Sequence, residues 1–464
     1  MKSIIYRFIS GGFYLVLDAA CIFASVFLAY TVYQFLGLGK SIDYSIWFLV
    51  KFSLGLCVVV CVTMYFFKAY NRESGILNVK EVRGVILGIL AGLILVNALF
   101  FAFRFLPSRY FVFLSFAFML LTLPLVRSII YTFMTGRMAR ALKQRVLIYG
   151  AGELGQRLFR EIHNSPRLPF QVVGFIDDDP GKSQGTIAPT GFQIDTHCKV
   201  LGGRNDLPRL VTDHAIDRIF IAISNITSTK LRELFVMCRE LAVEVAFVPF
   251  LHEIFIHRLE LERVGNLPLM REQRVPGSRW FDPAKRATDL LLSAFLGILL
   301  LPLVGLIALA IKADSQGPVF FRQNRVGKNG RIFQIYKFRS MVRDTPSYAV
   351  NPQSPDDPRI TRVGRFLRKT SLDELPQIIN VFRGEMSFVG PRPEMPFIVG
   401  QYNEVHKERL SVLPGITGLW QLSGDRKKAI HENMDYDLYY IYNQSFFMDI
   451  TILLQTLIFA FRGI

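Results

Sequence analysis

The chain has 464 residues, of which 51% are hydrophobic and 20% are charged, with 41 Phe and a mean hydropathy of +0.32. This composition is too apolar for a typical soluble enzyme and too charged for a simple channel, so a membrane protein with sizeable soluble parts fits best. The 54 basic and 37 acidic residues give a net charge of +17, which favours anionic partners. The sequence has no nucleic-acid-binding motif, so lipid headgroups and phosphorylated substrates come first.

Four apolar runs open the chain, at 13–36, 46–67, 85–103 and 110–131. Each is close to the ~20 residues that a helix needs to cross the hydrocarbon core. The first run is long and no cleavage signal follows it promptly, so we expect a retained anchor rather than a cleaved signal peptide. The distribution of Lys and Arg predicts that both ends of this four-helix transmembrane bundle, residues 1–136, face the cytoplasm. Asp18 and Arg127 lie near the ends of two runs, where pairing between helices or snorkelling is expected.

An α/β pattern follows over residues 137–255. The strand-like run R-V-L-I-Y leads into Gly150, Gly152 and Gly155, which have the G-x-G-x-x-G spacing of a dinucleotide-binding turn, and Asp177 ends the next strand-like run. Such glycines let the backbone approach a pyrophosphate, but they also permit close packing of a helix on a strand. We therefore predict a Rossmann-like domain with a structural or regulatory role, and bound nucleotide as the alternative.

An unusual apolar segment at 287–311 follows a strand-bearing linker expected at 256–280. Lys285 and Arg286 come directly before this segment, Asp289 lies near its start, and Pro302 interrupts it. A spanning helix here would move the seven Lys and Arg residues at 322–343 outward, against the positive-inside bias. Because proline removes a backbone hydrogen bond and kinks a helix, we predict a re-entrant helix that enters and leaves on the cytoplasmic side. A fifth spanning helix is the alternative.

The last third concentrates arginine, lysine, proline and glycine around a few acids. In chain order it contains Y-K-F-R-S-M, R-K-T-S-L-D-E-L-P-Q, S-F-V-G-P-R-P and P-G-I-T-G-L-W-Q. Cations held by rigid turns beside a bilayer suit phosphate groups, with adhesion to lipid headgroups as the alternative. The adjacent carboxylates Asp373 and Glu374 fit a helix that starts at Asp373, because Pro376 then lies in the first turn. A helix N-terminus also favours the ionised, nucleophilic form of a carboxylate.

These motifs, preceded by K-R-A-T-D, occur in the order seen in a known family. The block from Lys285 to residue 464 resembles the bacterial sugar transferases, also called polyprenyl-phosphate phosphohexose-1-phosphate transferases or monotopic phosphoglycosyl transferases. The bundle and the α/β domain resemble the large members of that family. The resemblance implies a mostly helical catalytic domain at 281–464, containing the re-entrant helix.

The resemblance also implies an activity. It is the transfer of a hexose 1-phosphate from a UDP-sugar to polyprenyl (undecaprenyl) phosphate with release of UMP, the first membrane step of exopolysaccharide, capsule or O-antigen synthesis. The sugar stays open among glucose, galactose and amino or deoxy sugars. Membrane lipids and a second copy of the chain are further expected partners, and nucleic acid is not. The expected location is the bacterial inner (plasma) membrane, with the soluble domains on the cytoplasmic side.

Site residues follow from the matching motif positions. Asp373 corresponds to the family's nucleophile, which forms a covalent phosphosugar intermediate and contacts Mg²⁺, and Glu374 to the acid that activates the lipid phosphate or assists the metal. Cations are also required on physical grounds, because a diphosphate and a carboxylate repel each other. The other expected substrate-binding residues are Lys337, Arg339, Arg368, Gln377 and Arg392.

Two rival functions make different demands on the sequence. A membrane-anchored nucleotide-sugar dehydratase or epimerase would need a Tyr-x-x-x-Lys pair, and no Tyr in this chain has Lys four residues on. A non-catalytic lipid-binding scaffold would tolerate the loss of Asp373, which a transferase would not.

Overall fold

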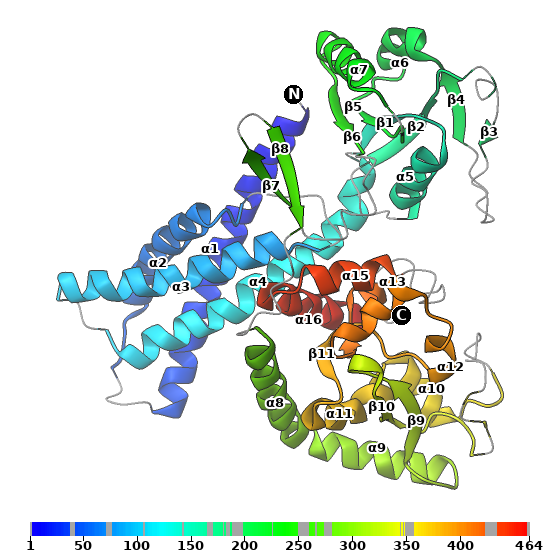
Figure 1. Cartoon of the computed structure of the whole chain (residues 1–464). Helices are drawn as coiled ribbons and strands as arrows, with labels where there is room; N and C mark the ends of the chain where they lie inside the picture. The colour runs from blue at the N-terminus through cyan, green and yellow to red at the C-terminus, as the bar shows by residue number, and fades with distance from the viewer. Residues whose placement is uncertain are drawn as a thin grey trace. The chain divides into compact units, whose positions relative to one another are not determined.

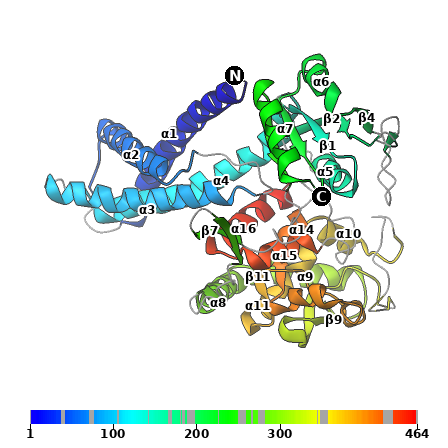
Figure 2. The ribbon, with the colours of Figure 1, turned by 45° about the horizontal axis from the view of Figure 1, so that its top comes forward.

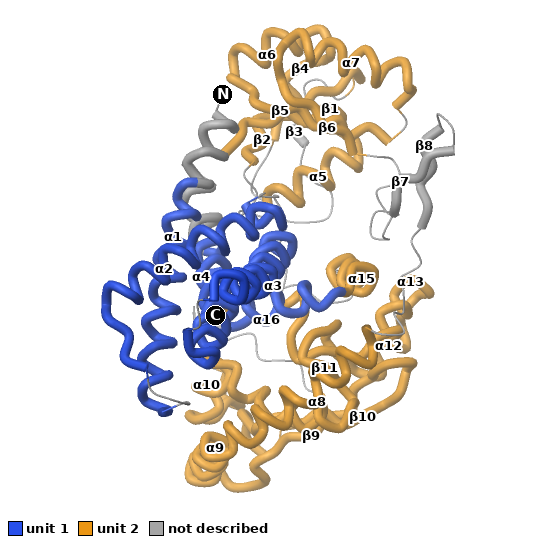
Figure 3. Tube along the Cα trace, turned by 90° about the vertical axis from the view of Figure 1, so that its left-hand side faces the viewer, with its two compact units in different colours: residues 1–133, 445–458 blue, residues 134–444, 459–464 orange. Residues whose placement is uncertain are grey.

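The computed structural model describes residues 2–37, 42–70, 77–104, 107–141, 143–164, 170–179, 181, 186–187, 198–224, 226–248, 259–264, 267–272, 281–343, 345–346, 348, 357–422 and 434–461. The chain forms two compact units (Figure 3). The first unit comprises Met1–Phe133 and Ser445–Ile458, and the second comprises Met134–Gln444 and Phe459–Ile464.

Long apolar helices make up the first unit. They are α1 (Lys2–Leu36), α2 (Ile46–Phe66), α3 (Val79–Ala102) and α4 (Arg109–Ala141), joined by the shorter α16 (Phe446–Phe461) (Figure 1). Four stretches are long and apolar enough to cross a membrane, Gly12–Leu36, Ile46–Phe66, Val79–Ala102 and Arg109–Thr132, which confirms the four predicted spans. The third helix begins earlier than predicted, because its polar first turn includes Glu81, which is buried against α4.

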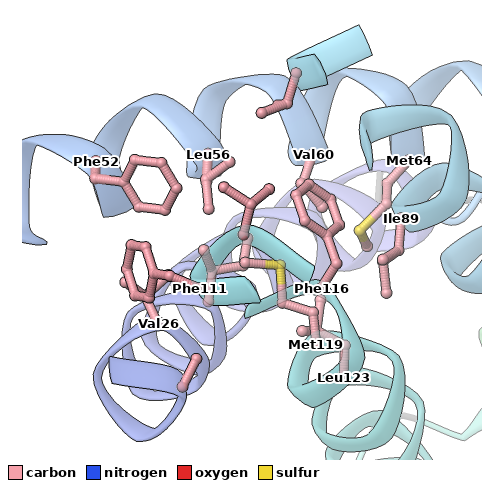
Figure 4. Packing of buried hydrophobic residues seen from close by; sticks show 14 of the residues in the cluster. Val26, Phe52, Leu56, Val60, Met64, Ile89, Phe111, Phe116, Met119 and Leu123 are labelled. Atoms are coloured by element: carbon pink, nitrogen blue, oxygen red, sulfur yellow. The ribbon is translucent and has the colours of Figure 1, made fainter. Parts of the chain in front are cut away.

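The core of this unit lies between the four helices and is rich in aromatic side chains. Phe111 is fully buried and its ring contacts Tyr30, Tyr33, Tyr44 and Phe52. Figure 4 shows part of the cluster, with labelled side chains from all four helices: Val26, Phe52, Leu56, Val60, Met64, Ile89, Phe111, Phe116, Met119 and Leu123. Close packing of this kind is what holds transmembrane helices together, since lipid tails are as apolar as the core.

A buried charge cluster links the helices of this unit. The Arg127 side chain is 1% exposed and donates from Nε to Asp18 Oδ1 at 2.9 Å and from Nη1 to Glu81 Oε1 at 3.3 Å. It also donates to the carbonyl of Ala69 at 2.8 Å. The predicted pairing of Asp18 and Arg127 between helices is therefore confirmed, and it compensates charges that would be costly inside a membrane.

A six-stranded sheet forms the middle of the chain. Its elements are β1 (Gln144–Tyr149), α5 (Glu153–Asn164), β2 (Phe170–Ile176), β3 (Thr186–Ile187), β4 (Cys198–Gly202), η1 (Arg204–Asp206), α6 (Leu207–Asp213), β5 (Arg218–Ile221), α7 (Ser228–Glu240) and β6 (Glu244–Phe247). The strand order is β3-β4-β2-β1-β5-β6, and β4, β2, β1, β5 and β6 are parallel. Helices cover both faces, because Ile148 packs in one cluster with Phe159 of α5 while Leu147 packs in another with Leu234 of α7 (Figure 2). The predicted α/β region with a parallel sheet is confirmed.

The segment between the sheet and the C-terminal region contains an antiparallel hairpin. Its strands are β7 (Leu259–Val264) and β8 (Leu267–Glu272). These strands fall inside the predicted linker 256–280, whose remaining residues lie outside the described ones.

Two helices meet at a sharp bend at the start of the C-terminal region. α8 (Phe281–Leu299) and α9 (Leu301–Asp314) differ in direction by 59°, and Leu300 lies at the break (Figure 1). Pro302 lies in the first turn of α9, where the missing N–H needs no partner, rather than in the middle of one kinked helix. The exposed apolar side chains of the pair are Leu290, Leu291, Phe295, Ile298, Leu299, Leu301, Leu306 and Leu309.

Polar residues at the start of α8 attach it to the rest of the second unit. The Arg286 guanidinium donates to the carbonyls of Val381 and Phe382 at 2.6 and 2.8 Å. Asp289 is buried, and its Oδ1 accepts from the Phe388 N–H at 3.2 Å. Arg286 and Asp289 therefore hold the first helix of the pair against residues 381–388, which follow the two adjacent acids in the chain.

The remaining elements are short. They are β9 (Phe320–Val326), η3 (Lys328–Gly330), β10 (Ile332–Phe338), α10 (Arg362–Lys369), η4 (Leu372–Gln377), α11 (Ile378–Arg383), β11 (Ser387–Val389), α12 (Pro396–Val399), α13 (Glu404–Lys407), η5 (Glu408–Ser411), β12 (Gly415–Thr417), α14 (Leu419–Leu422) and α15 (Asp435–Tyr442). β9 and β10 form an antiparallel pair, and β11 and β12 a parallel pair. A small core of Ile307, Ile311, Phe338 and Leu367 joins α9, β10 and α10. The region is mostly helical, as predicted.

Candidate active site

The adjacent acids Asp373 and Glu374 lie in the 3-10 helix η4, directly after α10. The helix begins at Leu372, one residue before the predicted start, and the Ser371 side chain makes no cap hydrogen bond. Ser371 has φ 55° and ψ 17°, a left-handed conformation that reverses the chain after α10. The prediction of a regular helix from Asp373 was therefore wrong in its start and its type. The tighter 3-10 turn precedes α11 and contains Pro376.

Glu374 is held by two cations. Its Oε1 accepts from Lys337 Nζ at 2.8 Å and from Arg392 Nη2 at 3.0 Å. Burial alone would raise its pKa, but Lys337 and Arg392 outweigh burial and hold the pKa of the Glu374 carboxyl well below its usual range. Glu374 is therefore a permanently ionised carboxylate that fixes the positions of both cations.

Asp373 has a different environment from its neighbour. Among the residues that the structure describes, none donates a hydrogen bond to its carboxylate. Burial raises the pKa of Asp373, the charge of Glu374 adds to this rise, and Lys337 and Arg368 oppose it. This corrects the expectation that a helix N-terminus favours the ionised form here, because burial outweighs the short 3-10 helix. Asp373 is thus the more basic of the two carboxylates.

The other predicted substrate-binding residues fall into two groups. Lys337 and Arg392 contact Glu374, and Arg368 is close enough that its charge, like theirs, lowers the pKa of Asp373. The Nη1 nitrogen of Arg368 is enclosed and has no hydrogen-bond partner among the described residues. A guanidinium N–H in that position can donate to a phosphate oxygen.

Arg339 and Gln377 are both buried, and Gln377 ends the same 3-10 helix that carries the acids. Arg339 is 6% exposed, and its guanidinium donates to the carbonyls of Ser315 and Gln316 at 2.7 and 2.9 Å. It lies over Gly317, where a Cβ would come within 2.1 Å of Arg339 Nη1. Arg339 thus binds the end of α9, and Gln377 is 2% exposed.

Arg325 is a further cation that the sequence did not single out. It donates from Nη1 to the carbonyl of Pro393 at 3.2 Å and from Nη2 to Gln323 Oε1 at 2.7 Å. Burial, together with the charge of Arg392, lowers the pKa of the Arg325 guanidinium to about 10. The two-residue period of a strand places Arg325 and Arg322 on opposite faces of β9, and this is the sequence signal that distinguishes them. An anion bound between Arg325 and Arg392 would relieve their mutual repulsion.

Metal binding at this site would rely on few protein ligands. No group of three or more His, Cys, Asp or Glu among the described residues could hold a metal ion. Mg²⁺, however, is commonly held by one or two carboxylates together with substrate phosphates. The free oxygens of Asp373 fit that role, whereas Oε1 of Glu374 is occupied by Lys337 and Arg392.

A pocket lies at the carboxyl ends of the parallel strands. Its volume is about 190 Å³, and its lining includes Tyr149, Gly150, Gly152, Asp177, Asp178, Ser224 and Lys230. A Cβ at Gly150 would lie 2.3 Å from the carbonyl oxygen of Ala222, and one at Gly155 would lie 1.9 Å from that of Gly150, so packing alone requires both glycines. Gly152 has open space around it.

The acids at this pocket are already engaged. Asp177 accepts from the Ala151 N–H at 2.8 Å and from the Asp179 N–H at 3.0 Å, so it fastens the glycine turn. Asp178 accepts from the Tyr149 hydroxyl at 2.7 Å and from Lys230 Nζ at 2.7 Å. These contacts favour the predicted structural role of the G-x-G-x-x-G turn, and a bound nucleotide stays the alternative.

Comparison with known proteins gives two matching families. Residues 280–463 match the family described as "Bacterial sugar transferase", and residues 65–249 match "CoA-binding domain". The solved structure of UDP-D-quinovosamine 4-dehydrogenase from Vibrio fischeri is 27% identical and covers 24% of this chain and 84% of its own, but its TM-score of 0.20 is too low to carry an argument.

Individual relatives align over most of the chain. An "Undecaprenyl-phosphate glucose phosphotransferase" of Komagataeibacter xylinus is 36% identical, covering 70% of this chain and 61% of the relative's own length. A "UDP-glucose:undecaprenyl-phosphate glucose-1-phosphate transferase" of Escherichia coli (strain K12) is 34% identical, covering 69% and 68%. An "Undecaprenyl-phosphate galactose phosphotransferase" of Salmonella typhimurium is 31% identical, covering 68% and 67%.

Proposed function

The chain belongs to the bacterial sugar transferase family, and from this premise we propose that it transfers a hexose 1-phosphate from a UDP-sugar to undecaprenyl phosphate. The products are UMP and an undecaprenyl diphosphate sugar, which begins the assembly of a surface glycan. The names of the relatives support glucose and galactose as the first sugars to test.

The observation that carries this proposal is the contrast between the two adjacent acids. Glu374 is tied to Lys337 and Arg392, whereas Asp373 accepts no hydrogen bond from the described residues and has a raised pKa. A nucleophile needs free lone pairs and basicity, and the cations beside it must neutralise the phosphate that it attacks. Asp373 meets the first need, and Lys337 and Arg392 meet the second.

The reaction we propose has two displacement steps. In the first, an Asp373 carboxylate oxygen attacks the phosphorus that bears the sugar, a P–O bond forms, and the bond from that phosphorus to the bridging oxygen breaks so that UMP leaves. In the second, a phosphate oxygen of undecaprenyl phosphate attacks the same phosphorus and releases the Asp373 carboxylate. One site can thus serve a water-soluble donor and a membrane-bound acceptor in turn.

The neighbouring residues stabilise the charge that moves in each step. Glu374 keeps Lys337 and Arg392 aimed at the reacting phosphate, and the free Nη1 of Arg368 supplies a further donor. We propose that Asp373 also contributes a ligand to Mg²⁺, which when bound neutralises phosphate oxygens.

The bent pair α8 and α9 supports a membrane-embedded position for this site. We propose that the helix pair enters and leaves the bilayer on the cytoplasmic side, with its 59° bend at the deepest point in the bilayer. Its exposed leucines, with Phe295 and Ile298, provide the lipid-facing surface. Arg286 and Asp289 would then couple the depth of the pair to the position of the acids.

The test is an assay of UMP release. Purified protein with Mg²⁺ and undecaprenyl phosphate is incubated with UDP-glucose, UDP-galactose and UDP-amino sugars, and wild type is compared with Asp373→Asn. The proposal predicts UMP release from at least one donor and its loss in Asp373→Asn. Release of UDP instead of UMP, or full activity in Asp373→Asn, would contradict the proposal. A non-catalytic scaffold would release UMP from none of the donors.

A further inference from the structure

The segment around Arg392 is held through its backbone carbonyls. Pro391 and Pro393 have no N–H, so the carbonyl oxygens carry most of the hydrogen bonding of this segment. Four consecutive carbonyls accept from four different donors: Pro391 from Gly415 N at 2.8 Å, Arg392 from Arg409 Nη2 at 2.5 Å, Pro393 from Arg325 Nη1 at 3.2 Å and Glu394 from Val326 N at 2.9 Å. The backbone on either side of Arg392 therefore has a defined position.

Arg409 is the more deeply buried of the two arginines among these four donors, and its ion pair with Asp437 is the shorter. It is 4% exposed, and its Nε donates to Asp437 Oδ2 at 2.6 Å while Nη1 donates to the Tyr402 hydroxyl at 2.7 Å. Asp437 is 1% exposed. Burying such a pair costs desolvation free energy that its own attraction often does not recover, so stability alone is a weak reason for its presence.

The helix that carries Asp437 supports the same segment at a second point. Tyr440, three residues later on α15, donates its hydroxyl hydrogen to the carbonyl of Val389 at 3.1 Å. Residues three apart lie on one face of a helix, so α15 supports this segment through Asp437 and Tyr440 together. The contact at the Arg392 carbonyl bears on the acids most directly, because it holds the residue whose side chain donates to Glu374 at 3.0 Å.

From these contacts we propose that Arg409, with Asp437 as its counter-ion, is a positioning residue for the transfer reaction. It fixes the backbone of Arg392 and so aims the Arg392 guanidinium at the substrate phosphate, without touching the substrate itself. This inference rests on the proposed function, because Arg392 acts on a phosphate only if the chain is a transferase. A shift of about 1 Å in such a group is enough to lower a rate by as much as about 100-fold.

The test is a double-mutant cycle on UMP release. Arg409→Met combined with Asp437→Leu replaces both charged side chains by apolar ones, a change that buried pairs often tolerate without loss of stability. We expect kcat/KM to fall by about 10- to 100-fold at a wild-type melting temperature. In an Arg392→Ala background we expect the paired replacement to cause no further loss, because Arg409 acts through Arg392.

A matched control and a milder variant keep the test decisive if the paired replacement does not fold. Leu438→Ala opens a cavity next to Asp437 on the same helix but removes no bond to the Arg392 segment, so at a temperature where it is folded its kcat/KM should stay within about twofold of wild type. Arg409→Lys keeps the charge but not the three-pronged donor geometry, so we expect a loss of about tenfold that also disappears in the Arg392→Ala background.

Each outcome decides between interpretations. Losses that multiply with that of Arg392→Ala, or an equal loss in Leu438→Ala, would mean that the pair only stabilises the fold and would overturn the inference. Absence of UMP release by the wild-type protein with every donor would instead refute the proposed function, and this inference with it.

Discussion

The salt bridge between Lys337 and Glu374 gives the sharpest prediction from the site geometry. The two side chains are 17% and 19% exposed and their atoms are 2.8 Å apart, so solvent screens the contact little. A hydrogen bond between charged groups of this kind contributes ~1.5–3 kcal/mol to the free energy of unfolding. Lys337→Met should lower the free energy of unfolding by about 2 kcal/mol, because Arg392 still pairs with Glu374. The rate should fall more steeply, by about 100-fold, because a donor aimed at the reacting phosphate is lost.

The pH profile of the Lys337→Met variant carries the specific signature. Asp373 must be ionised to attack, its pKa is raised by burial, and the charge of Lys337 opposes that rise. Removing Lys337 therefore raises the pKa of Asp373 further, so the acid limb of kcat/KM at saturating Mg²⁺ should move to higher pH. Lys328→Met, which removes a lysine that is 39% exposed on the turn between β9 and β10, is the control and should leave the limb in place. If the acid limb of kcat/KM in Lys337→Met is unchanged or moves to lower pH, this account of the site is refuted.

Substitutions at three further positions test other contacts. Ser371→Gly should raise the free energy of unfolding by about 0.5–1 kcal/mol in thermal melts, because glycine adopts φ 55° without strain, and Ser371→Val should lower it by ~1–2 kcal/mol. Arg325→Met should lower kcat/KM about tenfold and the free energy of unfolding by about 1–3 kcal/mol, because its bonds to Pro393 and Gln323 and its pairing with Glu394 are lost; wild-type kcat/KM in this variant would contradict a role for Arg325 in the site. Arg339→Met should lower stability by about 2–4 kcal/mol through its lost hydrogen bonds to Ser315 and Gln316, and an active variant of wild-type stability would contradict the placement.

Much of the chain could be predicted because its signals are periodic or local. The four apolar runs required only length and hydropathy, and the parallel sheet followed from strand-like runs that alternate with helical ones. The start of the third span was missed because Glu81 made its first turn look like a loop. Only the buried partner Arg127, 46 residues later, explains why an acid is tolerated there.

The site was harder to predict because its details depend on contacts between distant segments. In Y-K-F-R, Lys337 and Arg339 share one face of an extended chain, but β10 ends at Phe338 and Arg339 turns toward α9. The 3-10 turn at Leu372 and the raised pKa of Asp373 both depend on burial, which local sequence does not encode. Arg409 and Asp437 carry no motif of their own, and their role emerges only from the carbonyl that Arg409 contacts.

Capture of the covalent intermediate tests the central claim most directly. The protein is incubated with Mg²⁺ and its UDP-sugar in the absence of undecaprenyl phosphate, quenched, digested and analysed by mass spectrometry. The account predicts a burst of about one UMP per chain and a hexose phosphate on the peptide that contains Asp373, present in Glu374→Gln and absent in Asp373→Asn. Full turnover with undecaprenyl phosphate but no adduct on that peptide, or an adduct that persists in Asp373→Asn, would contradict it.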